Sequence, residues 1–260
     1  MTRIIPFFVP HSEDDLYPLT SALKMQEMLY KNTVASGGAI NYLMLAEHMP
    51  VYSYTPRKRM ERRLFRGNPE CLPAPLISAG IRGGSITFHG PGQLVAYFIL
   101  DMKRSGIAGS LHATATIIDI IIATLEKFGI ESFTLESLAA RNNKQITMKL
   151  QKQGAIESSC GQEKVIAAAK GAWVLTPDGT PKKVASLGLR ISNGVTRFGC
   201  ALNVSTDLSY FDHIYPCGLD LAITSMKEHS GISHAISEVA KIFAQTALLH
   251  LDQAQKVQKK

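Results

Sequence analysis

The stretch IRGGSITFHGPGQLVAY, from Ile81 to Tyr97, holds four glycines, one arginine and one histidine between two apolar runs. The apolar runs are typical of β-strands, whereas the glycines leave the backbone bare of side chains. These residues leave two interpretations open. One is a glycine-rich hairpin, and the other is a backbone cradle for part of a ligand.

The segments around this stretch predict a sheet with helices beside it. Strands are expected at residues 39–47, in consecutive runs from 76 to 100, in a hairpin over 168–192 and at 195–205. The pair Asp178-Gly179 is a strong turn signal for that hairpin. Apolar residues repeat at helical spacing in 16–32, 110–128 and 231–251. The fold class is therefore α+β (α/β in the broad sense), with a mixed β-sheet packed against helices in a single domain over residues 1–260.

One segment departs from this pattern. From about Glu136 to Ala167 the chain is rich in Asn, Lys, Gln, Ser and Gly. Such a composition favours irregular structure. Because strands resume directly afterwards, we expect a flexible insertion at about 136–167 within the domain rather than a domain boundary.

The overall composition is that of a soluble globular protein. The 260 residues are 45% apolar and 19% charged, with a mean hydropathy of +0.04. No apolar run reaches 18 residues, so we expect no membrane span and interpret Ala115–Ile130 as a core helix. The first residues lack the apolar core of a signal peptide. The four cysteines show no close spacing, which favours neither a zinc knuckle nor disulfides and suggests reduced thiols inside the cell.

The net charge of +7 suggests an anionic partner. The only dense basic cluster runs from Thr55 to Arg66 and contains a single aromatic residue, Phe65. We expect no nucleic-acid binding, and interpret this cluster as a solvated loop or a contact for an acidic protein.

Cys217 is the cysteine in the most constrained context. It stands between a proline and a glycine in IYPCGLD, where a rigid turn can present its sulfur. A structural turn cysteine remains equally open from this context. Cys71 and Cys160 are expected to be exposed, and Cys200 is expected to be a buried small apolar residue.

A cysteine nucleophile needs a cation or base beside it, because its free thiol is largely protonated at neutral pH. The candidates are His89, His213 and Lys183, and these residues alone do not separate Lys183 from its neighbour Lys182. Arg82 is expected either to hold an anionic group or to bind loop carbonyls. The chain has no phosphate-binding, dinucleotide-binding, zinc-protease or serine-hydrolase motif.

Four ordered blocks of the chain resemble the lipoyl(octanoyl) transferases, the octanoyltransferase family of lipoate biosynthesis. They are EHMPVY, RGGSITFHGPGQ, KVASLGLRISNGVTRFGCALN and IYPCGLDLAITSM, at residues 47–52, 82–93, 183–203 and 214–226. With ALKMQE near the start, the resemblance covers about residues 20 to 230. It implies a fold similar to the catalytic domain of biotin and lipoate ligases.

The resemblance also implies the site. Cys217 would be the acyl-thioester nucleophile and Lys183 the cation that stabilises its thiolate. The substrate-binding residues implied by position are Arg82, Gly83, Gly84, Ser85, Ile86, Thr87, Phe88, His89, Ser186, Leu187, Gly188, Gly199, Cys200 and Ala201. Neither a cofactor nor a metal is implied.

The implied reaction moves an octanoyl group from octanoyl-acyl carrier protein to a lysine ε-amine on a lipoyl domain. The acceptors would be the lipoyl domains of 2-oxoacid dehydrogenase complexes and the glycine cleavage H protein. Since transfer from thioester to amide runs downhill, ATP is not needed. The long 136–167 segment and the hairpin at 176–183 resemble eukaryotic members, which suggests a mitochondrial protein, or a cytoplasmic one if the source is bacterial.

Two positions depart from the family pattern. Phe198 stands where the family often has a histidine, which removes any hydrogen bond of that side chain, and Phe98 stands where a proline is usual. Two other functions are therefore weighed. An ATP-dependent lipoate or biotin ligase would share the fold, but the chain lacks that family's RRxSGGGxVxHD pattern. A non-catalytic carrier-binding relative is suggested by Phe198 alone.

Overall fold

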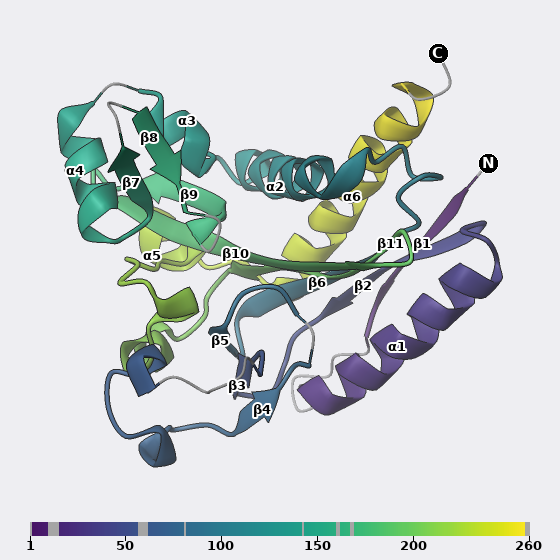
Figure 1. Cartoon of the computed structure of the whole chain (residues 1–260), viewed down its shortest axis with the longest axis horizontal. Helices are drawn as coiled ribbons and strands as arrows, with labels where there is room; N and C mark the ends of the chain where they lie inside the picture. The colour runs from purple at the N-terminus through teal and green to yellow at the C-terminus, as the bar shows by residue number, and fades with distance from the viewer. Residues whose placement is uncertain are drawn as a thin grey trace.

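The central feature of the computed structural model is a six-stranded mixed sheet (Figure 1). The structure describes residues 2–9, 16–56, 62–80, 82–141, 143–159, 162–166 and 169–257. In spatial order the strands are β1 (Arg3–Phe8), β2 (Ile40–Ala46), β6 (Gln93–Ile99), β11 (Val195–Asn203), β10 (Pro181–Ser192) and β9 (Gly171–Leu175). Only β1 and β2 pair in parallel within this sheet. Strand β1 was not anticipated from the sequence.

The middle of the sheet is covered on both faces. Every residue of β6 is buried, and alternate side chains point to opposite faces. One face carries α2 (Gly109–Lys127) and α6 (Ile236–Val257), and the other carries α1 (Leu19–Ala35) (Figure 1). We call the two cores the α2/α6 cluster, which includes Leu43, Leu94, Ala96, Phe98, Ile121 and Phe243, and the α1 cluster, which includes Ala22, Leu29, Met44, Val95, Tyr97 and Ile99.

The long apolar helix α2 belongs to this core. By length and composition it is the one helix in the described part of the chain that could cross a membrane. Its residues Ile117, Ile120, Ile121 and Leu125 repeat at helical spacing and are buried in the α2/α6 cluster. The prediction of a core helix in this segment is confirmed.

A smaller sheet carries the opening glycine stretch. Its strands are β4 (Leu76–Ser78), β3 (Val51–Tyr54) and β5 (Ile86–His89), in that order. Strands β5 and β6 do not pair with each other, so Gly90-Pro91-Gly92 is a corner between two sheets and not a hairpin turn. Gly92 has a φ of +77°, and a Cβ there would lie 2.6 Å from the carbonyl carbon of Ser205.

The 136–167 segment is folded wherever the structure describes it. It contains α4 (Lys144–Lys152), β7 (Ile156–Ser159) and β8 (Gln162–Val165), and α3 (Leu135–Ala139) overlaps its start. These elements share one hydrophobic core with Trp173 of β9. Their residues in this core include Leu135, Leu138, Ile146, Leu150 and Ile156. The expectation of an irregular segment is wrong there, because sparse apolar residues at helical spacing bury themselves against the hairpin β9–β10.

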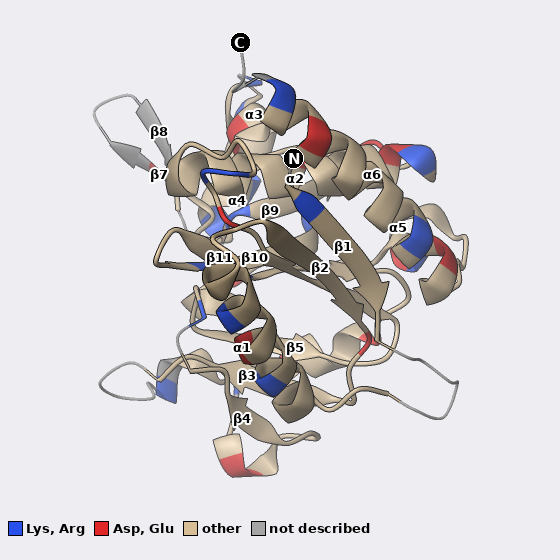
Figure 2. Cartoon of the chain, turned by 90° about the vertical axis from the view of Figure 1, so that its right-hand side faces the viewer, with Lys and Arg blue, Asp and Glu red and all other residues tan. Residues whose placement is uncertain are grey.

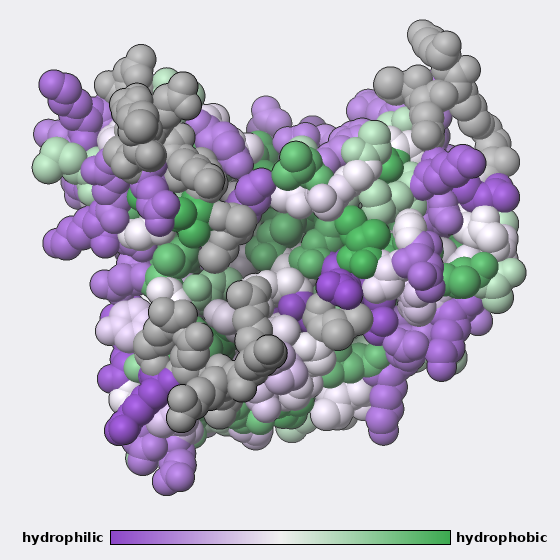
Figure 3. All heavy atoms as spheres, viewed as in Figure 1, coloured by the Kyte–Doolittle hydropathy of each residue, from purple (hydrophilic) through white to green (hydrophobic). Residues whose placement is uncertain are grey.

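Short elements complete the described chain. They are the 3₁₀ turns η1 (Arg62–Leu64), η2 (Pro69–Cys71), η4 (Leu208–His213) and η5 (Pro216–Gly218) and the helix α5 (Met226–Ser230). Lys and Arg are spread over several elements in Figure 2 and do not gather in one stripe. Figure 3 shows apolar side chains in the middle of one face, around β10 and β11, with polar residues at its ends.

Candidate active site

Cys217 lies in the 3₁₀ turn η5 with a left-handed backbone, at φ +56°. Outside glycine this conformation costs on the order of 1 kcal/mol, and such strain often accompanies functional sites. Pro216 is buried and anchors the turn, and the Gly218 N–H donates to the carbonyl of Tyr215 at 2.8 Å. The half-buried thiol is therefore held by a rigid turn, as the sequence predicted.

The end of the basic cluster holds the loop that carries Cys217. Arg66 donates to the carbonyl of Ile214 at 3.0 Å, pairs with Asp220 at 2.5 Å and lies 4.2 Å above the ring of Tyr215. The Tyr215 N–H donates to the carbonyl of Leu64 at 2.8 Å. Residues 57–61 of the predicted basic loop lie outside the described residues, as does Cys160.

Lys183 reaches the same site from β10. Its N–H donates to the carbonyl of Ala222 at 2.7 Å, and its carbonyl accepts from the N–H of Thr224 at 3.0 Å. The chain that follows Cys217 thus runs beside Lys183 as a short parallel bridge. This pairing brings together two residues that are 34 positions apart in the sequence.

The side chain of Lys183 is buried, with 3% of its surface exposed. Burial lowers the pKa of its ammonium group to about 8, while the charge of Cys217 acts in the opposite direction. Lys182 instead faces outward and pairs with Glu228 at 2.7 Å. The structure therefore separates the two lysines and brings only Lys183 into one pocket with Cys217.

Glycine makes room for this lysine. Gly171 of β9 has a φ of +153°, and a Cβ there would lie 2.0 Å from the carbonyl oxygen of Ala185 and 2.7 Å from Cε of Lys183. The register of β10 also shifts between Lys183 and Ala185, as a β-bulge does when it re-aims a side chain.

Arg82 lies on the pocket wall close to Cys217. A Cβ on Gly84 would be 3.1 Å from Sγ of Cys217 and 3.2 Å from Nη1 of Arg82. The guanidinium group donates to the carbonyls of Gly83, Ser53 and Ser85 at 2.7 to 3.3 Å. Its hydrogen bonds thus go to the loop carbonyls of Gly83 and Ser85 and to the carbonyl and hydroxyl of Ser53 in β3, and binding of loop carbonyls was one of the two roles expected for it.

Two buried histidines, His89 in the pocket wall and His48 behind it, contact each other. The two imidazole rings of His89 and His48 meet edge to face at 5.8 Å. His48 lies between the carbonyl of Tyr17 (2.8 Å) and the hydroxyl of Tyr97 (2.7 Å), and His89 Nδ1 bonds to Gln93 Oε1 at 2.7 Å. Burial lowers the pKa of His48 to about 4 and that of His89 to about 3.

Both histidines are therefore neutral at neutral pH. His89 lines the pocket, but it offers no positive charge to Cys217. His213 is exposed at the end of η4 and is absent from the described pocket lining. Among the three cations and bases weighed from the sequence, Lys183 alone is placed to act on the thiol.

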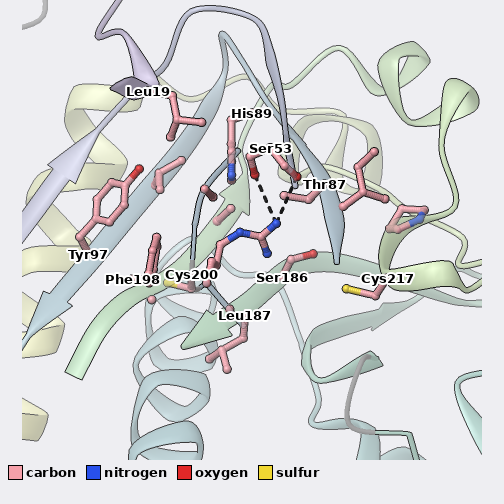
Figure 4. A pocket seen from close by; sticks show the side chains of 18 of the residues that line it. Leu19, Ser53, Thr87, His89, Tyr97, Ser186, Leu187, Phe198, Cys200 and Cys217 are labelled. Atoms are coloured by element: carbon pink, nitrogen blue, oxygen red, sulfur yellow. Dashed lines mark hydrogen bonds between the residues drawn. The ribbon is translucent and has the colours of Figure 1, made fainter. Parts of the chain in front are cut away.

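The pocket around Cys217 is lined by residues of α1, β5, β6, β10 and β11. Figure 4 shows Cys217 on one side of it and Phe198 and Tyr97 on the other. Ten of the fourteen residues implied as substrate-binding line it: Arg82, Ile86, Thr87, His89, Ser186, Leu187, Gly188, Gly199, Cys200 and Ala201.

The other four implied residues are not among the lining residues, although Gly84 lies beside Cys217 and Arg82. Gly83 packs against the backbone of Leu189, while Gly84 and Ser85 belong to the loop that holds Arg82. Phe88 points to the opposite side of β5 from Thr87 and His89, because strand residues alternate. Its ring stacks on that of Tyr210 at 4.2 Å in the core of the smaller sheet. Phe88 is thus a packing residue.

The structure adds pocket residues that sequence reasoning missed. These are Leu19 and Leu23 of α1, together with Ser53, Ala79, Val95, Tyr97, Phe198, Pro216 and Leu221. Most are ordinary apolar residues with no distinguishing motif. Only Phe198 carried a signal, since it departs from the family pattern. Cys200 is buried as predicted, and burial raises the pKa of its thiol.

Comparison with known proteins shows which family this chain belongs to. The model of the lipoyl protein ligase A/B catalytic domain matches residues 18–247. An octanoyltransferase of Rickettsia bellii is 32% identical over 214 residues, covering 82% of this chain and 85% of its own. One from Pseudomonas syringae pv. syringae is 34% identical over 218 residues, covering 84% and 80%.

Solved structures share the fold. Lipoate-protein ligase A bound with ATP superposes with a TM-score of 0.58 at 12% identity, covering 96% of this chain and 85% of its own. A bipartite lipoate protein ligase from Thermoplasma acidophilum gives 0.51 at 11% identity, covering 96% and 84%. Together with the family model and the relatives above 30% identity, this places the chain in the lipoyl protein ligase A/B catalytic domain family, among the octanoyltransferases.

Proposed function

We propose that this protein transfers an octanoyl group from octanoyl-acyl carrier protein to the ε-amine of a lysine on a lipoyl domain, in lipoate biosynthesis. Its relatives at 32% and 34% identity bear the name octanoyltransferase. One geometric observation carries the proposal. A buried lysine and a half-buried cysteine line one pocket, and the far end of that pocket is apolar.

In the first half-reaction the thiolate of Cys217 attacks the thioester carbon of the carrier. The Sγ–C bond forms, and the bond between that carbon and the carrier's sulfur breaks. The leaving thiolate takes a proton from the Lys183 ammonium and departs as a thiol. The pKa of Lys183, near 8, suits a group that must give up a proton near neutrality.

In the second half-reaction a neutral lysine amine of the lipoyl domain attacks the octanoyl-enzyme. The N–C bond forms, Cys217 leaves as a thiolate, and Lys183 takes up the amine's proton. Acylation removes the charge of Cys217, which is the influence that raises the pKa of Lys183. The pKa of Lys183 therefore falls below about 8 in the acyl-enzyme, so that it is neutral and can act as the base.

The surroundings of the two groups support this chemistry. Gly84 leaves free the space between Sγ of Cys217 and the guanidinium of Arg82, where the thioester carbonyl would develop negative charge. The net charge of +7 favours the acidic carrier protein. A mitochondrial location remains a prediction.

Intact-mass spectrometry after mixing with octanoyl-carrier tests the proposal. The wild type and Cys71→Ala, which removes an exposed thiol, should gain one octanoyl group, while Cys217→Ala should gain none. Adding a lipoyl domain should move the group to its lysine. A normal yield of adduct in Cys217→Ala would remove this cysteine from the mechanism, and product from free octanoate and ATP would indicate a ligase instead.

A further inference from the structure

Phe198 breaks the side-chain alternation of β11. Along this strand Cys200 and Leu202 face the α2/α6 cluster, while Val195 and Ala201 face the α1 cluster. Simple alternation would direct Phe198 to the side of Cys200 and Leu202. Its side chain instead packs in the α1 cluster, 4% exposed, and lines the pocket.

The backbone explains this reversal. Phe198 has a φ of +62°, a conformation in which a bulky residue is a genuine outlier. The buried amide oxygen of Gln26 on α1 accepts the Phe198 N–H at 2.8 Å and holds it there. The next residue, Gly199, lies so close to β6 that a Cβ would be 2.2 Å from the carbonyl oxygen of Ala96. The chain therefore keeps a strained backbone that turns this ring into the pocket.

The ring stands at the end of the pocket away from the thiol. In Figure 4 Ser186 lies between Cys217 and Phe198. Among the described lining residues Phe198 is the only phenylalanine, and its neighbours at this end include Val95, Tyr97 and Ala201. The hydroxyl of Tyr97 is bound to His48 at 2.7 Å, so Phe198 is the large side chain whose removal would lengthen the space.

The strand register gives the depth of this end. Gly171, beside Cε of Lys183, pairs with Ser186, and Phe198 pairs with Leu189. Three residues of antiparallel strand rise about 10 Å. Seven C–C bonds of about 1.5 Å in an extended zigzag span about 9 Å. The rise along β10 from the position opposite Gly171 to the position opposite Phe198 is therefore close to the length of an extended eight-carbon acyl chain.

We propose that Phe198 is the end wall of the acyl pocket and sets the longest acyl chain that the protein accepts, at about eight carbons. This inference rests on the proposed function, since it concerns the same pocket. It adds a specificity-determining residue that acts by excluding volume, and it predicts that the limit on chain length moves with the size of this one side chain.

The test uses Phe198→Gly, because glycine accepts a positive φ without strain and removes the whole ring. Wild type and variant are mixed with acyl-carriers of six to fourteen carbons, and the adduct on Cys217 is followed by intact mass. The ratio of decanoyl to octanoyl adduct should rise by about tenfold in the variant, because two more methylenes become buried. Phe198→Leu should give a smaller rise and serves if the glycine variant does not fold.

A matched control removes a ring elsewhere. Phe98 lies on the neighbouring strand β6 within the α2/α6 cluster and does not line the pocket, so Phe98→Leu should lower stability and leave the chain-length profile unchanged. An unchanged profile in Phe198→Gly, or an equal shift in Phe98→Leu, would overturn the proposal.

A second measurement separates this inference from the proposed reaction. Calorimetry with free fatty acids of the same lengths measures their affinity for the pocket without any chemistry at Cys217. If wild type binds octanoate but forms no adduct, the proposed function fails, while a shift of binding towards longer acids in Phe198→Gly still supports the end wall. If adducts form but neither the adduct profile nor the binding profile shifts in Phe198→Gly, the proposed function stands and only the end-wall role of Phe198 is overturned.

Discussion

Three non-glycine residues in the described part of the chain have a positive φ: Asn193, Phe198 and Cys217. Asn193 precedes Gly194 in the tight turn between β10 and β11, where this conformation is ordinary. The other two line the pocket. At the scale of single residues, backbone strain is therefore concentrated where the reaction would occur, with the thiol near one end of the pocket and the ring at the other.

Lys183 should be needed for acylation and its neighbour should not. We expect Lys183→Met to slow formation of the octanoyl-enzyme by about 10²- to 10⁴-fold, whereas Lys182→Met should retain the rate, since Lys182 is paired with Glu228 at the surface. Acylation by the wild type should also decline as the pH rises through about 8, where Lys183 loses the proton that the leaving thiolate needs. Rapid-quench mass spectrometry across pH 6 to 9 measures both effects, and equal rates in the two variants would contradict the assignment.

The space beside Lys183 depends on Gly171. Gly171→Ala would press a Cβ against Ala185 and against the stem of the lysine. We expect a loss of about 1–3 kcal/mol in the free energy of unfolding, together with slower acylation. Gly179→Ala is the control, because Gly179 also has a positive φ but no atom lies within 4 Å of the new Cβ. Urea unfolding and acylation assays compare them, and an equal acylation rate in both variants would contradict the crowding argument.

At the scale of elements, the central strands and helix α1 contribute side chains both to the hydrophobic core and to the pocket. Strand β6 sends Leu94, Ala96 and Phe98 to one face and Val95 and Tyr97 to the other. Helix α1 covers the α1 cluster, contributes Leu19 and Leu23 to the pocket and holds Phe198 through Gln26. Helices α2 and α6 lie on the face away from α1 and supply stability.

The stabilising role of α2 is open to measurement. Ile121 is fully buried, and Ile121→Ala should lower the free energy of unfolding by about 2–5 kcal/mol through the cavity it leaves. Leu111 is on the same helix but 75% exposed, so Leu111→Ala should change the free energy of unfolding by less than about 0.5 kcal/mol. Urea titration of both variants measures the difference. Similar losses in both would mean that α2 does not pack as described.

At the scale of the whole molecule, buried polar groups join the two sheets. Gln93 of β6 accepts from His89 of β5 and donates to Asn203 Oδ1 of β11 at 2.9 Å. The N–H of Gly92 donates to a carboxylate oxygen of Glu47 at 2.6 Å. The corner that the glycine stretch makes is therefore hydrogen-bonded on both sides, and it sets the smaller sheet against the larger one.

This junction should make stability sensitive to acid. The unfolded chain takes up protons at the usual histidine pKa near 6.5, but folded His48 and His89 stay neutral until about pH 4 and pH 3. The unfolded state thus binds more protons in this window, so the free energy of unfolding should fall as the pH drops below about 6.5. Each histidine contributes about 1.4 kcal/mol per pH unit. Urea titrations from pH 4.5 to 7.5 should show a shallower slope in His48→Gln, and an unchanged slope would contradict the argument.

Much of this architecture was predictable from local patterns. The helices in 16–32 and 110–128, the hairpin with its Asp178-Gly179 turn and the strand at 195–205 appear close to where they were expected, while the helix expected at 231–251 runs from Ile236 to Val257. The failures have one cause. Strand β1 and the folded 136–167 segment are both stabilised by partners distant in the sequence, β2 for the first and Trp173 for the second, and local patterns do not reveal such partners.

The sequence by itself determined what depends on neighbouring residues: the rigid Pro-Cys-Gly turn, the bare backbone of the glycine stretch and the Asp178-Gly179 turn of the hairpin. Only the tertiary structure brought Lys183 rather than Lys182 into one pocket with Cys217, turned Arg82 towards backbone carbonyls and brought Phe198 to the end of the pocket. Those outcomes rest on long-range backbone pairing, above all that of Lys183 with residues 222–224. Such contacts depend on how distant segments pack together, which no local pattern specifies.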